Sequence, residues 1–365
     1  MIDSSILIVN NVPECSDGIS GGTIISNRNE KLIKQNFKSV YVYNHIYKNS
    51  SKGKNILLSF FGVSLGLTLK EQKKILKLAE ENKCDYVFLG YSTLGILAKK
   101  MKKKNIKVIT FFHNIEYNYF KDHIHNSSLL VKMIGLSIKR CTYLNEGYAV
   151  KYSDQIIVLN ERDSYELEKV YKGHTTLILP TTFDDMYDEV IAMRNSITSF
   201  QKKLLFVGSD FFGNTEGLFW FIEKCLDDIN AELIVVGSGM DKYINTYKNK
   251  KVTFKGFVND LSLEYYSADL VVLPILSGSG MKTKTCEALM YGKTIVATKE
   301  AFEGYTKEMF ETGAGFLCST ASDFITTINS ILKTQTSKNN INSRNIFQNN
   351  YNTTKYVKKF ENIFK

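Results

Sequence analysis

Short apolar runs alternate with longer amphipathic segments along most of the chain. In the first half the apolar runs are rich in Val, Ile, Leu and aromatic residues, and they lie at Ser5–Asn10, Val40–Tyr43, Asp85–Leu89, Lys107–Phe112, Gln155–Leu159 and Thr176–Leu179. Continuous apolar runs separated by helix-length segments are typical of parallel strands that are buried on both faces. The pattern therefore predicts a doubly wound α/β domain, in which ligands bind beyond the carboxyl ends of the strands.

The alternation breaks once and then resumes. Pro180 ends a strand and an acidic run follows it, so we expect the interdomain linker between 181 and 203. New apolar runs then lie at Leu204–Val207, Glu232–Val236, Val252–Phe254, Asp269–Leu273, Thr294–Ala297 and Gly315–Leu317. The pattern predicts two Rossmann-like doubly wound α/β domains, 1–185 and 186–345, with a crevice between them. Residues 346–365 end in an apolar stripe that predicts a final helix.

Composition indicates a soluble globular protein. The 365 residues are 44% hydrophobic and 23% charged, and their number suits two domains of ordinary size. The six cysteines are scattered without a C-x-x-C pair, which favours a reduced, cytoplasmic chain. The amino terminus carries Asp3 and too short an apolar run for a signal peptide, and no apolar stretch is long enough to span a membrane.

The formal net charge of +10 requires an anionic partner or a solvated surface. Lysines are densest on a predicted helix end, at Lys99, Lys100, Lys102, Lys103, Lys104 and Lys107. They either rest on an anionic membrane leaflet, as a peripheral contact on the inner face, or oppose the helix dipole in solvent. No zinc-finger spacing, RNA-binding motif or basic heptad region is present, so nucleic acid is not an expected partner.

The stretch Asp269–Tyr305 contains the clearest candidate chemistry. It predicts a buried strand, a Gly/Ser loop at Ser277–Gly280, a helix with Lys282, Lys284 and Glu287, and a second buried strand. Glycines let the loop approach an anion, and the first turn of the helix presents unpaired N–H groups to it. A cation beside a diphosphate and a carboxylate beside vicinal hydroxyls are suited to a nucleotide sugar.

Two loops of the first domain are further candidates. Ser20-Gly21-Gly22 precedes a predicted helix, where the glycines either bring amides to a phosphate or sugar ring or form a turn that caps the helix. This loop is not G-x-G-x-x-G, which disfavours a dinucleotide cofactor. His113 follows a buried strand directly, so it either meets a ligand at the strand end or is a structural residue.

The segment Gly278–Val296 resembles the donor-binding signature of retaining, family 4-like GT-B glycosyltransferases (glycosyl transferases group 1). The resemblance implies that Glu287 binds the ribose hydroxyls of the donor. Members often hold the transferred sugar with an earlier Glu, whose position is Ser279 here, and a subgroup with a G-x-G-x-[KR]-x-K pattern matches Gly278–Lys284. His113-Asn114-Ile115-Glu116 is similar to a segment of the same family, which implies that His113 contacts the donor and that Asn114 and Glu116 orient the sugar or acceptor.

The resemblance extends over both predicted domains. Gly256-Phe257-Val258 is similar to a family turn that packs against the nucleotide base, and Gly208-Ser209 corresponds to a loop where the family often has Arg and Lys. Because Asp210–Glu216 contains no basic residue, Lys282 and Lys284 are expected to supply the positive charge that neutralises the donor diphosphate. The resemblance also implies that the last helix packs back toward the first domain.

These observations predict a metal-independent, retaining GT-B glycosyltransferase whose two domains face across a cleft. The donor is a nucleotide sugar, with UDP and GDP both open, the acceptor is a glycan or a lipid-linked sugar, and no cofactor is expected. His113 is the expected catalytic residue, and the expected donor-binding residues are Gly21, Gly22, Gly208, Ser209, Gly256, Phe257, Val258, Ser279, Gly280, Met281, Lys282, Lys284 and Glu287. A non-catalytic partner subunit and a sugar-nucleotide hydrolase or epimerase of the same fold remain alternatives.

Overall fold

The computed structural model describes residues 2–13, 21–47, 52–118, 129–195, 201–248 and 250–364. These described residues form two compact units. Those within 2–13, 22–180 and 356–364 belong to the first, and Gly21 and those within 181–355 belong to the second. The first unit thus ends at Pro180, whereas the sequence placed the boundary at 185–186. The end of the chain joins the first unit at Tyr356, whereas the predicted final segment began at 346.

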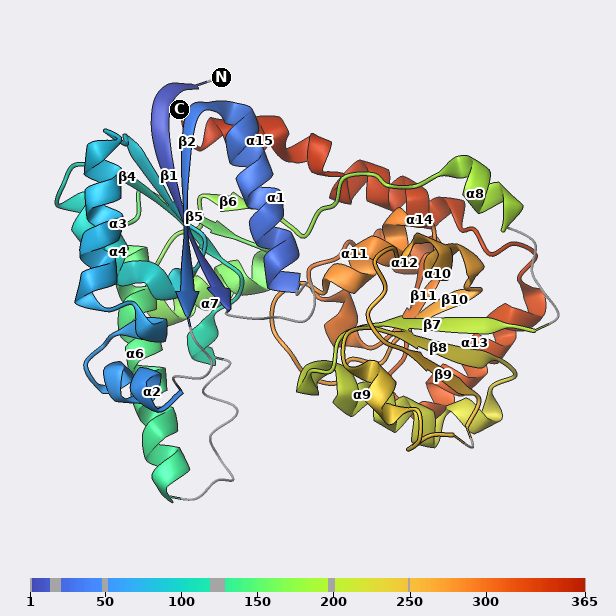
Figure 1. Ribbon diagram of the computed structural model, residues 1–365. Helices are drawn as coiled ribbons and strands as arrows, with labels where there is room; N and C mark the ends of the chain where they lie inside the picture. Colours follow the sequence, from blue (N-terminus) through green and yellow to red (C-terminus); the bar gives the residue numbers. More distant parts are fainter. Residues whose placement is uncertain are drawn as a thin grey trace. The chain divides into compact units, whose positions relative to one another are not determined.

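A six-stranded sheet forms the centre of the first unit (Figure 1). Its strand order is β2-β1-β3-β4-β5-β6, and every neighbouring pair is parallel. The strands are β1 (Ile2–Pro13), β2 (Phe37–Tyr47), β3 (Tyr86–Leu89), β4 (Lys107–Phe112), β5 (Gln155–Val158) and β6 (Leu177–Ile178). β3 is buried at each position, as expected for a strand covered on both faces.

Helices connect these strands. They are α1 (Gly21–Asn36), α2 (Lys52–Phe60), α3 (Leu69–Glu81), α4 (Gly95–Lys102), α6 (Leu129–Tyr152), α7 (Glu161–Tyr171) and α15 (Val357–Asn362), with 3₁₀ turns η2 (Ser64–Gly66) and η3 (Ser92–Leu94). α3 and α7 begin with side-chain caps from Thr68 and Asn160, which accept from backbone N–H groups of the first turn. α15 is anchored in the same unit, because Phe360 packs near Phe88 and the Tyr86 hydroxyl donates to the Phe364 carbonyl oxygen at 3.1 Å.

The second unit has a parallel sheet of the same size. Its strand order is β12-β11-β10-β7-β8-β9. The strands are β7 (Lys203–Val207), β8 (Glu232–Val236), β9 (Val252–Lys255), β10 (Leu270–Leu273), β11 (Ile295–Ala297) and β12 (Gly315–Leu317). The central strand β10 is buried throughout, and it is followed by the loop and helix that the sequence singled out. The predicted α/β class with two parallel sheets is confirmed, and each expected apolar run contributes one strand.

The helices of the second unit are mostly short. They are α8 (Glu189–Arg194), α9 (Phe212–Lys224), α10 (Ser262–Ser267), α11 (Thr283–Met290), α12 (Glu308–Glu311), α13 (Ala321–Thr334) and α14 (Ile341–Ile346), with single turns η4 (Leu226–Asp228), η5 (Met240–Tyr243), η6 (Lys299–Phe302), η7 (Phe347–Tyr351) and η8 (Thr353–Tyr356). None of the helices in the described parts of the chain has both the length and the apolarity needed to cross a bilayer.

Candidate functional site

Helix α11 is buried except along one stripe. Thr283, Lys284 and Glu287 keep partial exposure, whereas every other residue of the helix is buried. Residues at this spacing project from one side of a helix. The accessible side of an otherwise apolar helix therefore carries a cation and an anion.

Glu287 is held by an aromatic residue beneath it. Its Oε2 accepts a hydrogen bond from the Tyr265 hydroxyl at 2.9 Å, and the Tyr265 ring stacks on Tyr291 with 4.8 Å between centroids. Burial raises the pKa of Glu287 to about 7, against the opposing effects of the Tyr265 hydrogen bond and the Lys284 charge. When this carboxyl group is ionised, the oxygen that does not bond Tyr265 can accept hydrogen bonds from hydroxyl groups of a ligand.

Lys284 lies beside Glu287 in a similarly dry environment. Its ammonium donates to the side-chain oxygen of Asn214 and lies over the Phe206 ring, 5.0 Å from the centroid. The pKa of Lys284 is lowered to about 7, mainly by burial and also by the Lys282 charge, while the Glu287 charge opposes the shift. A cation destabilised in this way gains most from an anionic ligand, because a phosphate restores the charge balance that water no longer provides.

Lys282 stands at the N-cap of α11, one residue before the helix that was predicted to carry it. Its ammonium folds back on the preceding loop, where it donates to the carbonyl oxygens of Ser279 at 3.1 Å and Gly280 at 3.2 Å. It also pairs with Glu300 at 2.7 Å, in a bridge whose side chains are largely buried. Lys282 therefore braces the loop as well as contributing charge.

The loop before α11 has a conformation that requires glycine. Gly280 has a φ of +62° and Gly278 a φ of +149°, both of which L side chains rarely adopt. Met281 is buried, and its sulfur lies 3.4 Å from the backbone nitrogen of Thr181. Ser279, which occupies the position of the family's sugar-binding Glu, keeps partial exposure. The loop is thus fixed at Met281 and accessible at Ser279.

Gly208 and Ser209 follow β7, and Gly208 lies close to the ammonium group of Lys284. A Cβ on Gly208 would lie 3.0 Å from Lys284 Nζ and 3.0 Å from the Asn214 amide, so glycine makes room for that hydrogen bond. The Ser209 carbonyl accepts from Asn214 Nδ2 at 2.9 Å, which orients the amide. The structure therefore brings Gly208, Ser209 and Lys284 together, and it adds Asn214, which sequence reasoning missed.

The same loop exposes two aromatic side chains that the sequence reasoning did not use. Phe211 and Phe212 are 56% and 60% exposed. Their signal in the sequence is an F-F-G-N run directly after a strand. Large exposed rings at a strand end are unusual for a solvated loop and are suited to contact a sugar or base.

The predicted base-binding turn follows β9. Gly256 and Val258 are partly exposed and Phe257 is 55% exposed, while the Gly256 carbonyl accepts from the Gly237 N–H at 3.2 Å. The turn thus joins the carboxyl ends of β8 and β9 at the sheet edge where β7 and β10 also end. Its role in base recognition stays a prediction.

His113 of the first unit is held tightly just past β4. Its Nε2 lies 3.1 Å from the Gly90 carbonyl oxygen, and its ring stacks on Tyr91 at 4.4 Å between centroids. Burial and the nearby Arg28 charge lower the pKa of His113 to about 3, against the carbonyl contact. Since a carbonyl can only accept, the neutral ring carries its proton on Nε2 and leaves Nδ1 as an acceptor.

Glu146, on α6, anchors the turn that follows His113. It is fully buried and accepts from the backbone N–H groups of Glu116 and Tyr117 at 3.0 and 3.1 Å. The hydroxyls of Ser92 and Tyr171 donate to it at 2.9 and 2.8 Å. Burial raises the pKa of Glu146, and these hydrogen bonds oppose the shift. The sequence signal was available, since Glu146 is the one acidic residue of α6, yet it was missed.

The negative charge of Glu146 affects the pKa of Glu116. The pKa of Glu116 is raised to about 7, mainly by burial and also by the Glu146 charge, while a hydrogen bond with Asn114 opposes the shift. The cluster at the end of β4 therefore contains a neutral imidazole and a carboxyl group that changes protonation near neutrality.

The remaining candidates lie elsewhere. Gly21 and Gly22 form the first residues of α1 instead of the loop before it, while Ser20 and Cys15 lie outside the described residues. The lysine-rich segment lies at the amino ends of the strands, where Lys102 pairs with Asp154 and Lys104 pairs with Glu80 at 2.9 Å. Among the residues that the structure describes, no group of three or more His, Cys, Asp and Glu side chains is arranged to hold a metal ion.

Part of the second unit matches a known family of proteins. Residues 201–334, which contain α11 and its loop, match the family model described as Glycosyl transferases group 1. The second unit therefore contains a stretch that is similar to glycosyl transferases group 1. The chain is also 24% identical over 272 residues to a Klebsiella pneumoniae protein described as an "uncharacterized 44.6 kDa protein in cps region". That match covers 66% of this chain and 64% of the relative.

Solved structures of glycosyltransferases with the GT-B fold resemble this chain over nearly its whole length. Sucrose-phosphate synthase from Thermosynechococcus elongatus has a TM-score of 0.74 at 15% identity, over 99% of this chain and 98% of that chain. Anabaena HepE in complex with UDP-glucose has a TM-score of 0.69 at 13% identity, over 98% and 99% of the two chains. The predicted GT-B fold is thereby confirmed.

Proposed function

We propose that this protein transfers a sugar from a nucleotide-sugar donor to a glycan or lipid-linked acceptor, with retention of anomeric configuration and without a metal ion. The observation that carries the proposal is the accessible stripe of α11. It presents Lys284 and Glu287 side by side on a helix that is otherwise buried. Burial of two ionisable groups is costly without a partner, and a diphosphate and a ribose complement them.

Each part of the donor has a counterpart in the second unit. The diphosphate lies against the loop of Gly278–Gly280 and the first N–H groups of α11, with Lys284 as the main cation. Glu287 accepts the ribose hydroxyls while Tyr265 holds its other oxygen. The turn Gly256–Val258 contacts the base, and Ser279 replaces the carboxylate that many family members direct at the sugar.

Bond cleavage depends on stabilisation of the leaving diphosphate. Negative charge develops on the phosphate oxygen as the glycosidic bond breaks, and preorganised cations and N–H groups in a dry site stabilise it strongly. Lys282 is held near that loop by Glu300, and Lys284 gains a proton when the anion forms. These charges take the role that a divalent ion has in other transferases.

His113 is proposed to contact a hydroxyl of the transferred sugar. Because Nε2 is bonded to Gly90, the free Nδ1 accepts hydrogen bonds and does not donate to a phosphate. Asn114 and Glu116 remain candidates for orienting the sugar or the acceptor.

Two similar proteins guide the choice of donors to be tested first. HepE was crystallised with UDP-glucose, and the Klebsiella relative is described by a cps region, so we propose a role in surface polysaccharide synthesis and choose UDP-sugars first. A reduced, cytoplasmic location is proposed as well. It is supported by five cysteines that are free and buried among the residues that the structure describes.

The proposal is tested by a thermal-shift and turnover screen over UDP-, GDP- and other nucleotide sugars. A donor that binds only the folded state must raise the melting temperature. We expect one nucleotide class to stabilise the protein, Glu287→Ala to abolish the effect, turnover to survive a chelator, and NMR to show a retained anomer in the product. Wild-type turnover by Glu287→Ala would refute the assignment.

The same screen separates the alternatives. Release of free sugar or of an epimerised nucleotide without acceptor would indicate a hydrolase or an epimerase. Absence of stabilisation by every nucleoside diphosphate would favour a non-catalytic partner subunit, which is the alternative that Ser279 raises.

A further inference from the structure

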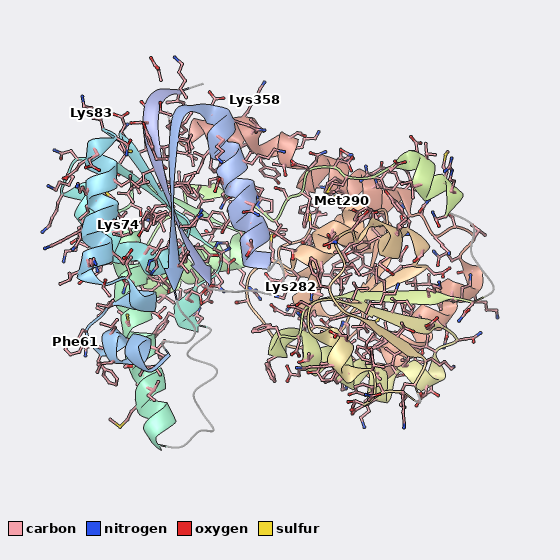
Figure 2. All side chains as sticks on the ribbon, in the orientation of Figure 1. Phe61, Lys74, Lys83, Lys282, Met290 and Lys358 are labelled. Atoms are coloured by element: carbon pink, nitrogen blue, oxygen red, sulfur yellow. The ribbon has the colours of Figure 1, made fainter. Side chains whose placement is uncertain are left out.

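The ammonium group of Lys282, which Figure 2 labels, is surrounded by acceptors of its own unit. It donates to the carbonyl oxygens of Ser279 at 3.1 Å and Gly280 at 3.2 Å, and it pairs with Oε1 of Glu300 at 2.7 Å. An ammonium group has three N–H donors, so these three acceptors match its full capacity. To contact a phosphate of the donor directly, Lys282 would have to give up one of them.

The surroundings of the ion pair keep it in place. The side chains of Lys282 and Glu300 are 13% and 20% exposed, so solvent screens their attraction only weakly. The Tyr305 hydroxyl donates to the backbone carbonyl oxygen of Lys282 at 2.7 Å. The Thr285 hydroxyl donates to the carbonyl oxygen of Ala301 at 2.7 Å, which ties α11 to the turn η6 that carries Glu300. Both ends of the pair are therefore anchored by separate hydrogen bonds.

The first glycine of the loop makes room for this pair. A Cβ on Gly278 would lie 3.2 Å from both Cε and Nζ of Lys282 and 3.8 Å from Oε1 of Glu300. Its φ of +149° is also one that L side chains rarely adopt. Glycine at this position is therefore explained by the meeting of the ammonium group and the carboxylate above the loop backbone.

The contacts of Lys282 also set the direction of two peptide groups. In a trans peptide group the C=O and the N–H point in opposite directions. Because the carbonyl oxygens of Ser279 and Gly280 turn toward the ammonium group, the N–H groups of Gly280 and Met281 point away from it. Successive N–H groups on one side of a loop form an arrangement that binds anions. Lys282 thus orients the amides that the proposed donor site uses.

Glu300 has the wrong sign for a site that binds a diphosphate. Like charges repel each other, so a carboxylate near the loop lowers the affinity of the loop for an anion unless it has another role. Its contact with Lys282 supplies that role, because it holds the ammonium group against the two loop carbonyls. The arrangement therefore favours a fixed loop over a mobile cation.

We propose that the Lys282–Glu300 pair positions the Gly/Ser loop for the donor diphosphate and that Lys282 keeps its three contacts when the donor binds. This inference rests on the proposed function and gives the two lysines of the site different roles. Lys284 contacts the diphosphate, whereas Lys282 and Glu300 are positioning residues that act through the amides of the loop.

Glu300→Met distinguishes a positioning role from direct contact, because the two roles predict opposite changes. Loss of the carboxylate removes a negative charge and releases the ammonium group, so donor affinity would rise if Lys282 contacted the diphosphate. If the pair positions the loop, donor affinity falls. We expect calorimetry with UDP-glucose to show a loss of about tenfold for Glu300→Met, a similar loss for Lys282→Met, and no further loss in the double variant. Affinity at or above the wild-type value in Glu300→Met overturns the proposal.

Hydrogen exchange without donor separates this inference from the proposed function. The full-length protein is measured by mass spectrometry, and the readout is the exchange rate of the backbone amides in residues 277–283. We expect exchange at least about fivefold faster in Glu300→Met and in Lys282→Met. Unchanged exchange in both variants overturns the proposal, whatever the donor affinity. If wild type bound no nucleotide sugar while both variants exchanged faster, the proposed function would fail and the positioning of the loop by the pair would be supported.

Asp227→Asn is the matched control. Asp227 pairs with Lys250 in the same unit, near the amino ends of β8 and β9, so the variant removes one lysine–carboxylate pair on the far side of the sheet from the donor loop. It is expected to keep the wild-type donor affinity and the wild-type exchange rate of the loop.

Glu300→Gln guards against misfolding of the apolar variants. It removes the charge but keeps a side-chain oxygen that accepts from Lys282, so the loop is held less firmly without a gap in the structure. We expect a loss of about threefold in affinity for UDP-glucose at an unchanged melting temperature. A gain in affinity would overturn the proposal.

Discussion

The hydroxyl of Tyr265 lies 2.9 Å from Glu287 Oε2, so a tyrosine buried under α11 holds the carboxyl group that the helix presents outward. The tyrosine cannot ionise in competition, because burial and the Glu287 charge raise its pKa well above the usual value. It therefore acts as a permanent donor. One carboxylate oxygen is occupied by the protein, and the other is left for a ligand.

Tyr265→Phe is expected to shift the pH range of donor binding. Removing the hydrogen bond removes a factor that lowers the pKa of Glu287, so the carboxylate form appears only at higher pH. The acid limb of UDP-glucose affinity, measured by calorimetry across the pH range, should move upward. Loss of this bond should also lower the free energy of unfolding by about 1–3 kcal/mol. An unchanged acid limb would show that the titration belongs to another group.

Donor affinity is expected to be bell-shaped in pH with a maximum near neutrality. Glu287 must lose its proton to accept hydroxyls, so affinity rises with pH through the pKa of about 7. Lys284 must keep its proton to bind phosphate, so affinity falls as pH rises above its pKa of about 7. Because an anion raises that pKa, binding above neutral pH should take up a proton, which calorimetry in buffers of different ionisation enthalpy measures.

Single variants show which residue causes the acid limb and which causes the alkaline limb of the pH dependence of donor affinity. Lys284→Met should remove the alkaline limb and the proton uptake, and Glu287→Gln should remove the acid limb. Each should weaken affinity at the optimum by about tenfold to a hundredfold, as expected for charge-assisted hydrogen bonds. If Lys284→Met bound the donor with wild-type affinity, the diphosphate would lie elsewhere.

Gly208→Ala is expected to weaken donor binding with little effect on folding. The added Cβ would lie 3.0 Å from Lys284 Nζ, so the ammonium must leave its contact with Asn214. We expect a loss of about tenfold in affinity for UDP-glucose. Gly147→Ala, toward the end of α6, is the control, because its Cβ would meet nothing closer than 3.9 Å. This control should stabilise the protein by about 0.5–1 kcal/mol and leave affinity unchanged.

His113 is expected to make the first unit sensitive to acid. Its pKa is about 3 when folded, against about 6.5 in an unfolded chain, so the unfolded state binds more protons between these values. Stability that is complete above the unfolded pKa is therefore lost as pH falls toward 3. His113→Gln should flatten the dependence of urea unfolding between about pH 5 and about pH 7. A slope equal to wild type would show that the imidazole is not protected from protonation.

Strands and their order of appearance were predictable because burial on both faces leaves a continuous apolar run, and each run became a strand. The signature around Glu287 was also readable, since the loop, helix and strand are consecutive. Tyr265 and Glu300 were not readable as partners, because only the placement of β10 between β11 and β7 brings their segments to α11. Local patterns also placed Lys282 inside the helix and Gly21 outside one, which are errors of one to three residues at a helix end.

Glu146 shows a different limit of sequence reasoning. Its four hydrogen bonds come from α7, from η3 and from the turn after β4, which are separate in the sequence. A single acidic residue in a long helix looks like a solvent-facing charge until the tertiary structure supplies donors for it.

The 24 residues of α6 span about 36 Å at the usual helical rise. Near its beginning the helix carries Met133 and Leu136, and further along it carries Glu146, which grips the peptide turn behind His113. One continuous helix therefore joins these exposed side chains to the backbone turn beside His113. A displacement of the early turns of α6 would be transmitted through Glu146 to the position of the imidazole.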